Sequence, residues 1–357
     1  MSNLHVDKNL VIDVNIKSDD LVWHNALNAP LEVFGVEFSD GLYRRMPKDV
    51  AKSVSEKVYV LHSNTSGGRI RFRTDSPSIA VFVRYTSIYR SSHFPLLGSA
   101  GLDLYVKGEG DAVEHYEASF MPPYDMEDHY ASRYDFMDGA AMREVTVNMP
   151  LYSDVSEILI GVVEGSELLP PLPYTSDKKI VYYGNSITQG ACASRPGNAF
   201  PTYASRAVGC DFINLGFSGS GRAEDEIAEY IAGLDMQIFV YDYDHNAPNP
   251  EYLLATHEKM FLKIREKHPK IPVVMLTRTS FKTRDKDRNA RFEIIRKTYD
   301  NAVARGDENV YLIDGREVFG ELWGEATVER LHPGDLGQIL IGRALVPVLQ
   351  KILGDVK

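Results

Sequence analysis

Cysteine and tryptophan are scarce in this chain of 357 residues, and it has no long apolar run. Its two cysteines, Cys192 and Cys210, are too few for the disulfide framework of a small secreted domain. No apolar run is long enough to cross a bilayer, and the N-terminus carries no apolar stretch of the kind found in signal peptides. These absences predict a cytoplasmic protein without a membrane partner.

Positive charge is also in short supply. The chain has 39 Lys and Arg against 50 Asp and Glu, which gives a formal net charge of -11. Because nucleic-acid binding needs clustered Lys and Arg, this balance argues against a nucleic-acid partner. The remaining composition, 44% hydrophobic and 25% charged, is that of a globular protein, and the length predicts two domains.

The first part of the chain has the pattern of an all-β domain. From about residue 10 to 165, short segments rich in β-branched and aromatic residues are separated by turns, as in KVYVLHSN (57–64), SIAVFVRYTS (78–87) and EILIGVV (157–163). This predicts an antiparallel β-sandwich, similar to a jelly roll, over residues 1–170. The proline-rich segment LLPPLPYTSDKK (168–179) suits a link between domains.

The second part, residues 171–357, alternates strands with helices. Five apolar segments read as strands, and helical patterns separate them: IVYY (180–183), DFINLGF (211–217), MQIFVYDY (236–243), IPVVML (271–276) and NVYLID (309–314). The helix after the third strand has Asn249 as its expected N-cap, and His257 reads as one of its surface residues. This alternation predicts a doubly wound α/β domain with a five-stranded parallel sheet.

Polar residues gather just after these strands, at the sheet edge where α/β proteins place their sites. Ser186 follows the first strand in GNSITQG. A serine at this junction is typical of a helix N-cap, although Gly184 and Gly190 also allow a sharp turn that would expose its hydroxyl. Gly219, in the glycine-rich turn after the second strand, allows a ligand to approach the backbone closely. That turn does not match the dinucleotide-binding fingerprint.

The loops after the third and the last strand hold further candidates. Asp242, Asp244 and His245 suggest a metal, but alternate residues of an extended segment point to opposite sides, so the histidine would not join the carboxylates. The amide of Asn246 is a neutral donor that suits a developing oxyanion. His332 stands before a proline, and Glu329, three residues earlier, could orient its ring.

In this order the residues resemble the sequence blocks of the SGNH (GDSL-type) hydrolases. Those blocks hold a serine in G-x-S-I-T, a glycine, an asparagine, and an acidic residue three positions before His-Pro; the resemblance covers about residues 178–354. GLDLY (101–105) also resembles the G-x-D-L-Y motif of the β-sandwich that precedes one esterase subgroup. The chain departs from the family in having Asn185 before the serine, DHNAP (244–248) in place of G-x-N-D, and Glu329 where aspartate is usual.

The resemblance implies a flavodoxin-like SGNH domain and a role for each residue. Ser186 would be the nucleophile, His332 the general base and Glu329 the acid that orients it. Asp335 is an alternative acid, although its position predicts a cap for the last helix. The N–H groups of Ser186 and Gly219 and the Asn246 amide would form the oxyanion hole. This chemistry requires no cofactor and no metal.

The implied activity is hydrolysis of small acyl esters, with O-acetyl groups on carbohydrate as the expected substrate, either a small molecule or an oligosaccharide. The segment SSHFPLLGSAGLDLYV (91–106) is the candidate for a wall of the cleft. Within it, Asp103 and Tyr105 either reach substrate or share a carboxylate–phenol hydrogen bond inside the sandwich. An acyltransferase with the same triad and a non-catalytic carbohydrate-binding protein stay open as alternatives. The sequence does not determine the oligomeric state.

Overall fold

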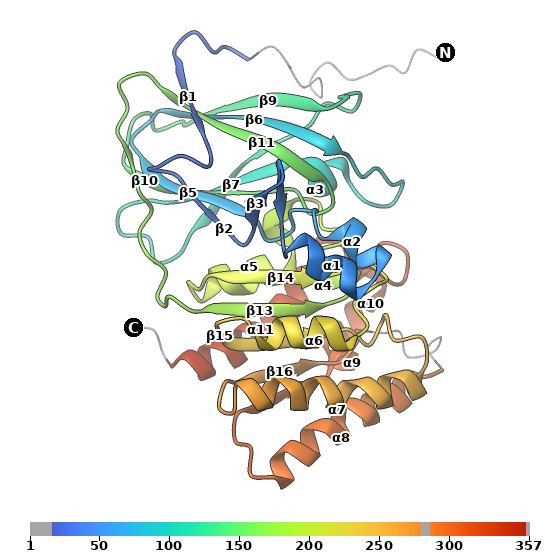
Figure 1. Cartoon of the computed structure of the whole chain (residues 1–357). Coiled ribbons are helices and arrows are strands. Elements are labelled where there is room, and N and C mark those ends of the chain that lie inside the picture. The colour runs from blue at the N-terminus through green and yellow to red at the C-terminus, as the bar shows by residue number, and fades with distance from the viewer. Residues whose placement is uncertain (1–15, 280–285, 355–357) are drawn as a thin grey trace, which may run out of the picture.

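Two antiparallel sheets form the N-terminal part of the chain (Figure 1), in a computed structural model that describes residues 16–279 and 286–354. The first sheet runs in the order β1 (Leu21–Asn25), β11 (Asp154–Val163), β6 (Ser78–Ser87), β9 (His129–Asp135). The second runs β12 (Leu168–Leu169), β5 (Arg69–Thr74), β10 (Arg143–Asn148), β7 (Leu102–Lys107), β8 (His115–Phe120), with β2 (Glu32–Phe34) also on β5. A hairpin of β3 (Glu37–Ser39) and β4 (Leu42–Arg44) stands beside them.

The two antiparallel sheets enclose one apolar core, as the period-two patterns predict. Buried side chains at alternate positions, such as Ile79, Val81 and Val83 of β6, face Val145 and Val147 of β10. The all-β sandwich expected from the sequence is therefore confirmed.

One segment of this part was predicted wrongly. KVYVLHSN forms not a strand but most of helix α2 (Glu56–Leu61), directly after α1 (Lys48–Val54). The hydroxyl of Ser55 accepts the N–H of Val58 at 3.2 Å, so Ser55 caps α2. Ala51 and Val58 pack into the core of the following α/β domain, and this tertiary contact outweighs the β-branched composition.

The second part contains the predicted five-stranded parallel sheet. Its order is β14 (Phe212–Gly216), β13 (Lys179–Gly184), β15 (Met236–Asp242), β16 (Val273–Leu276), β17 (Val310–Ile313). In chain order this is 2-1-3-4-5, the flavodoxin-like arrangement. The chain winds away from β13 in both directions, so the loops after β13, β14 and β15 meet at one edge. The predicted domain boundary at residue 170 falls between β12 and β13 and stays a prediction.

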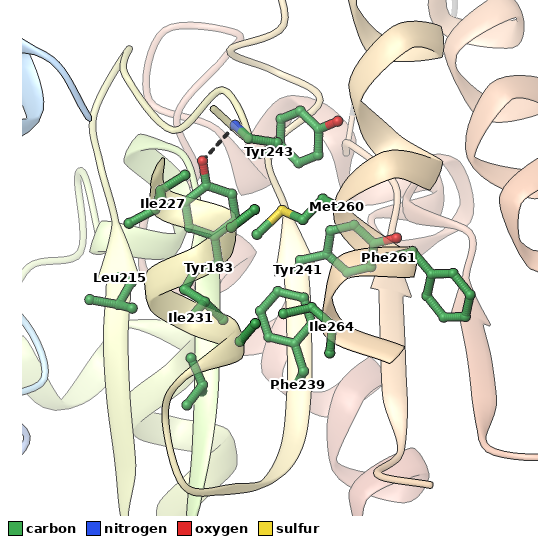
Figure 2. Close-up of a cluster of buried hydrophobic side chains, with 14 of the residues drawn as sticks. Tyr183, Leu215, Ile227, Ile231, Phe239, Tyr241, Tyr243, Met260, Phe261 and Ile264 are labelled. Atoms are coloured by element: carbon green, nitrogen blue, oxygen red, sulfur yellow. Dashed lines mark hydrogen bonds between the residues drawn. The ribbon is translucent and has the colours of Figure 1, made fainter. Parts of the chain in front are cut away.

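Helices cover both faces of the parallel sheet (Figure 1). One face carries α5 (Phe200–Ala207) and α11 (Asp335–Leu353); the other carries α6 (Asp225–Ala232), α7 (Pro250–Lys267) and α8 (Arg288–Ala304). Figure 2 shows the second of these cores, where the N–H of Ala223 donates to the hydroxyl of Tyr183 at 2.7 Å. Shorter helices α9 (Gly315–Val318), η3 (Gly320–Leu322) and α10 (Trp323–Ala326) link β17 to α11.

Helix α7 bears out one prediction and contradicts another. Asn249 is its N-cap, with the side chain accepting the N–H of Tyr252 at 2.8 Å. His257, however, is 2% exposed and not on the surface. Its ring stacks on Tyr241 with 4.6 Å between centroids, and its Nδ1 lies 2.9 Å from the hydroxyl of Thr298. Burial lowers the pKa of His257 to about 3, so it is a neutral core residue.

Among the described residues, α11 is the one helix long and apolar enough to cross a membrane by length and composition. It packs against α5, with Ile341, Leu345 and Leu349 fully or almost fully buried in the core. Helix α11 thus buries one face, as is typical of a helix that covers the sheet of a doubly wound domain. The expectation that the protein has no membrane partner stays a prediction.

The β-sandwich and the α/β domain share a polar, buried interface. Arg69 of β5 forms an ion pair with Asp211, just before β14. The hydroxyl of Ser66 donates to the carbonyl of Gln189 at 2.7 Å, and the hydroxyl of Tyr152 to the carbonyl of Ser186 at 3.1 Å. These contacts reach α4 (Ser186–Gln189), so the sandwich supports the helix that begins at Ser186.

Candidate active site

Ser186 lies at the sharp turn between β13 and α4. The cap of this helix is Asn185, whose Oδ1 accepts the N–H of Ile187 at 2.7 Å, while its Nδ2 donates to the carbonyl of Asp242 at 2.7 Å. The capping role considered for Ser186 thus belongs to Asn185, the position where the chain departs from the family pattern. Ser186 is the first residue of the helix, and its hydroxyl is left for other chemistry.

The turn at Ser186 requires glycine on both sides. A Cβ at Gly184 would stand 2.1 Å from the hydroxyl of Thr188 and 2.5 Å from the carbonyl of Asp242. Gly190 ends α4 in the left-handed region, with φ of 99°. A side chain at either position would move the serine, because these contacts involve backbone and a packed side chain.

His332 brings its ring to Ser186 from the loop before α11. Its Nε2 lies 2.9 Å from the hydroxyl oxygen of Ser186. Its Nδ1 hydrogen-bonds to Oε1 of Glu329, which also accepts the backbone N–H of His332 at 3.1 Å. A short antiparallel bridge between Thr327 and Pro333 closes this loop. The structure therefore brings together the three residues that the sequence singled out in two motifs far apart in the chain.

Hydrogen bonds to Glu329 fix the orientation of the His332 imidazole. Burial raises the pKa of Glu329, but the hydrogen bonds from His332 outweigh it and leave that pKa below its usual range. An ionised Glu329 accepts a hydrogen bond from the N–H at Nδ1, which leaves the lone pair of Nε2 facing the hydroxyl of Ser186. The exposed fractions fall from 35% for the Glu329 side chain to 17% for His332 and 8% for Ser186.

Asp335 does not act as the predicted helix cap. The N-cap of α11 is Gly334, and Asp335 is its first residue. The Asp335 carboxylate accepts the backbone N–H of Ser194 at 2.7 Å and also its hydroxyl. It therefore ties the loop after α4 to α11, while Glu329 holds His332.

Gly219 and Asn246 lie in the two loops that flank the loop of Ser186. Gly219 has φ of 67°, and no atom stands within 4 Å of the place where a Cβ would project. Asn246 donates one amide hydrogen to the carbonyl of Phe217 at 3.0 Å. This bond orients the amide and leaves its second hydrogen available. Gly221 packs against the carbonyl of Gly184, and a Cβ there would stand 3.7 Å from the Asn246 amide.

The structure does not place Asp242, Asp244 and His245 together as a group with metal-ligand spacing. Among the described residues, the cluster with metal-ligand spacing is a different one, made of His93, Cys192, Glu329 and His332. Both aspartates are buried, with exposed fractions of 4% and 1%. Burial, and after it the neighbouring Asp244, raises the pKa of Asp242 well above its usual value.

Asp103 and Tyr105 lie at the interface between the domains, away from solvent. Asp103 is 0% exposed, and its two oxygens accept from Asn148 (2.8 Å) and from the N–H of Gly197 (2.7 Å). Arg195 of the α/β domain donates to both Asp103 and the hydroxyl of Tyr105. The predicted substrate contact is therefore not supported, and neither is the hydrogen bond between the two side chains. The motif instead fastens one domain to the other.

Sequence reasoning missed two neighbours of the triad. His93 follows β6 in the sandwich, and its ring centroid lies 5.7 Å from that of His332. Cys192 follows α4, is 3% exposed, and has φ of 65°. The segment 91–106 was expected to form a wall of the cleft, and His93 is the residue in it that reaches the triad. No local pattern marks either residue, because their neighbourhood forms only when the two domains meet.

A serine, a histidine and a carboxylate hydrogen-bonded in series at the carboxyl edge of a doubly wound sheet are the arrangement of a serine hydrolase. Residues 177–350 match the GDSL-like lipase/acylhydrolase family, and residues 21–168 match the N-terminal domain of SGNH-hydro-type esterases, known as GxDLY. The chain belongs to this family of serine ester hydrolases and has its two-domain form.

Solved structures of similar shape cover nearly the whole chain. A Bacteroides ovatus protein described as a GDSL-like lipase is 29% identical, with a TM-score of 0.82 over 93% of this chain and 98% of that one. The salicylyl-acyltransferase SsfX3 is 23% identical (TM-score 0.72; 95% and 99% covered). An acetyl xylan esterase from Butyrivibrio proteoclasticus is 12% identical (TM-score 0.60; 94% and 100%). The comparison with curated proteins finds no match.

Proposed function

We propose that this hydrolase removes small acyl groups, acetyl foremost, from carbohydrate, with Ser186 as nucleophile, His332 as general base and Glu329 as the orienting acid. The observation that carries the proposal is the hydrogen bond of 2.9 Å between the Ser186 hydroxyl and Nε2 of His332, whose other nitrogen is held by Glu329. This distance lies within the range over which a base can take the proton of a hydroxyl nucleophile.

The reaction follows from the positions of these groups. As the Ser186 oxygen bonds to the ester carbonyl carbon, its proton passes to Nε2 of His332, and Glu329 stabilises the resulting imidazolium. The tetrahedral intermediate then expels the alcohol oxygen, which takes the proton back from His332, and an acyl-enzyme remains. Water gives a proton to His332 and attacks the acyl carbon. The second tetrahedral intermediate releases the carboxylic acid and restores Ser186.

The oxyanion of both intermediates would be bound by the N–H groups of Ser186 and Gly219 and by the Asn246 amide. The N–H of Ser186 is at the first position of α4, where a helix leaves its N–H groups without an internal partner. Gly219 has open space on its Cβ side, and Asn246 is oriented by its bond to Phe217. Neutral donors fixed in advance stabilise the charge that develops on the carbonyl oxygen.

Carbohydrate as the substrate class is suggested by solved structures that share the fold of this chain. Solved structures of the same two-domain fold include family two carbohydrate esterases, one of them in complex with cellohexaose, and an acetyl xylan esterase. These structures are at most 14% identical to this chain, so they support the fold and suggest the substrate class. Acetylated oligosaccharides are therefore the first natural substrates to try.

An acyltransferase is the second candidate. SsfX3, an acyltransferase by name, has the same fold over 95% of this chain. Ser186 is only 8% exposed, and a sheltered nucleophile favours transfer to an alcohol over attack by water. Turnover of p-nitrophenyl acetate in the presence of increasing alcohol separates the two: an esterase releases mainly acetate, and a transferase releases mainly the new ester.

The proposal is tested with p-nitrophenyl acetate and butyrate, on the wild type and on Ser186→Ala. We expect the wild type to turn over the acetate faster, and the variant to have no activity above background while its circular dichroism is unchanged. A variant that is as active as the wild type would remove Ser186 from the mechanism. Acetylated xylan and acetylated cello-oligosaccharides then serve as substrates, with release of acetate as the readout.

A further inference from the structure

We propose that His93, Cys192, Glu329 and His332 form a binding site for a thiophilic divalent cation, Zn²⁺ foremost, and that the bound ion blocks the esterase reaction. One potential ligand atom from each of the four side chains lies within 4.8 Å of every other. Tetrahedral zinc with bonds of about 2.0–2.3 Å places its ligands roughly 3.3–3.8 Å apart. The four side chains thus need to close in by about 1 Å, a shift within the range of rotamer adjustment.

The kinds of ligand select the metal. Two imidazoles, a thiolate and a carboxylate are a donor set typical of zinc, and the sulfur disfavours Mg²⁺ and Ca²⁺, which take oxygen ligands. With the thiol deprotonated, the set carries a charge of about -2, which a divalent ion neutralises. The binding half of the proposal is independent of the proposed function; the inhibition half rests on it.

The surroundings of His93 and Cys192, the two residues outside the triad, place both side chains next to it. The hydroxyl of Ser91 lies 2.7 Å from Nδ1 of His93, and a bridge between Ser91 and Phe94 closes the turn that carries the ring. A hydrogen bond to one ring nitrogen orients the other toward a metal, as in many zinc sites. Phe94 packs edge-on against Tyr152 with 5.1 Å between centroids, in the same buried cluster as Cys192.

Glu329 and His332 belong both to the triad and to the metal site, so metal binding and catalysis exclude each other. A metal on Nε2 of His332 replaces the hydrogen bond to Ser186, and a metal on Nδ1 replaces the bond to Glu329. In the first case the base loses the lone pair that accepts the serine proton; in the second it loses its orientation and its countercharge. The ion would therefore act as a reversible inhibitor, bound at a site to which both domains contribute ligands.

Inhibition is measured on protein freed of metal with a chelator, at buffered concentrations of free Zn²⁺, with each protein compared with its own metal-free rate. We expect full, reversible inhibition of the wild type. Cys192→Ser and His93→Gln should each need roughly tenfold more Zn²⁺ or higher for half-inhibition. Cys210→Ser is the matched control, since Cys210 is also buried but hydrogen-bonds with Thr175 and Gln237, and it should behave as the wild type. Equal Zn²⁺ sensitivity in all four proteins would overturn the proposal.

Binding is measured separately with Co²⁺, whose thiolate complexes have a strong ultraviolet absorption band. We expect one Co²⁺ per chain with such a band in the wild type and in Ser186→Ala, and no band in Cys192→Ser. No band in the wild type would overturn the site. A band in a protein without any esterase activity would keep the metal site and reject the proposed function, so the two failures can be told apart.

Discussion

Replacing Asp103 with alanine is expected to loosen the joint between the two domains. The Asp103 carboxylate, in the middle of the G-x-D-L-Y motif, accepts from Asn148 beside it in the sandwich and from Gly197 and Arg195 in the α/β domain. Ser194, in the loop that carries Arg195 and Gly197, is hydrogen-bonded to Asp335, the first residue of α11. The loop of His332 ends just before this helix. Asp103 thus holds a segment next to the active site.

The expected loss of stability is about 3–5 kcal/mol. Without the carboxylate, a side-chain amide, a backbone N–H and a guanidinium lose their acceptor where Asp103 is 0% exposed, and each buried orphan donor costs about 1–3 kcal/mol. Two effects keep the total below the sum. Burial raises the pKa of Asp103 despite these donors, so ionised Asp103 is itself costly. The Arg195 side chain is 18% exposed and can turn to water.

The free energy of unfolding of Asp103→Ala is measured by urea denaturation followed by circular dichroism. In thermal unfolding the variant should have a Tm roughly 5–15 °C below that of the wild type. Asp125→Ala, an exposed aspartate of the same domain, is the control and should stay within about 0.5 kcal/mol of the wild type. Gly197→Ala should be similarly harmful, because its Cβ would stand 2.3 Å from the ring of Tyr105. If Asp103→Ala unfolds within 1 kcal/mol of the wild type, the carboxylate does not hold the domains together.

Three further predictions concern the site. Asn246→Ala should lower kcat by on the order of 10²–10³ with unchanged circular dichroism, and near-normal turnover would exclude Asn246 from the oxyanion hole. Glu329→Gln should lower kcat by about 10²–10⁴, and a smaller loss in single-turnover assays would assign the orienting role elsewhere. Asp242→Asn should flatten the pH dependence of the free energy of unfolding. Because the pKa of Asp242 is raised in the fold, protonated Asp242 contributes stability. That contribution is complete below about pH 4 and is lost as the pH rises through the raised pKa. An unchanged difference in Tm between pH 5 and pH 8 would contradict this.

The alternation of elements could be predicted from the sequence, because it depends on local periodicity. Period-two runs such as SIAVFVRYTS became strands with the predicted bounds, and the helix after Asn249 began where its cap predicts. The family motifs also located Ser186, Glu329 and His332, since the serine and the acid–histidine pair each stand in a short segment with its own local pattern. Their hydrogen-bonded geometry then follows from the order of the parallel strands, which brings these loops to one edge.

Contacts between distant segments could not be predicted from the sequence, because no local pattern encodes which surface a residue will pack against. The segment at 57–64 has strand-like composition, yet it forms a helix because its apolar side chains pack on the α/β domain. His257 has the sequence setting of a surface residue, and the face of α7 that it occupies is the one the sheet covers. Asp103 contacts Gly197, and His93 contacts His332, only because the sandwich packs on the hydrolase domain.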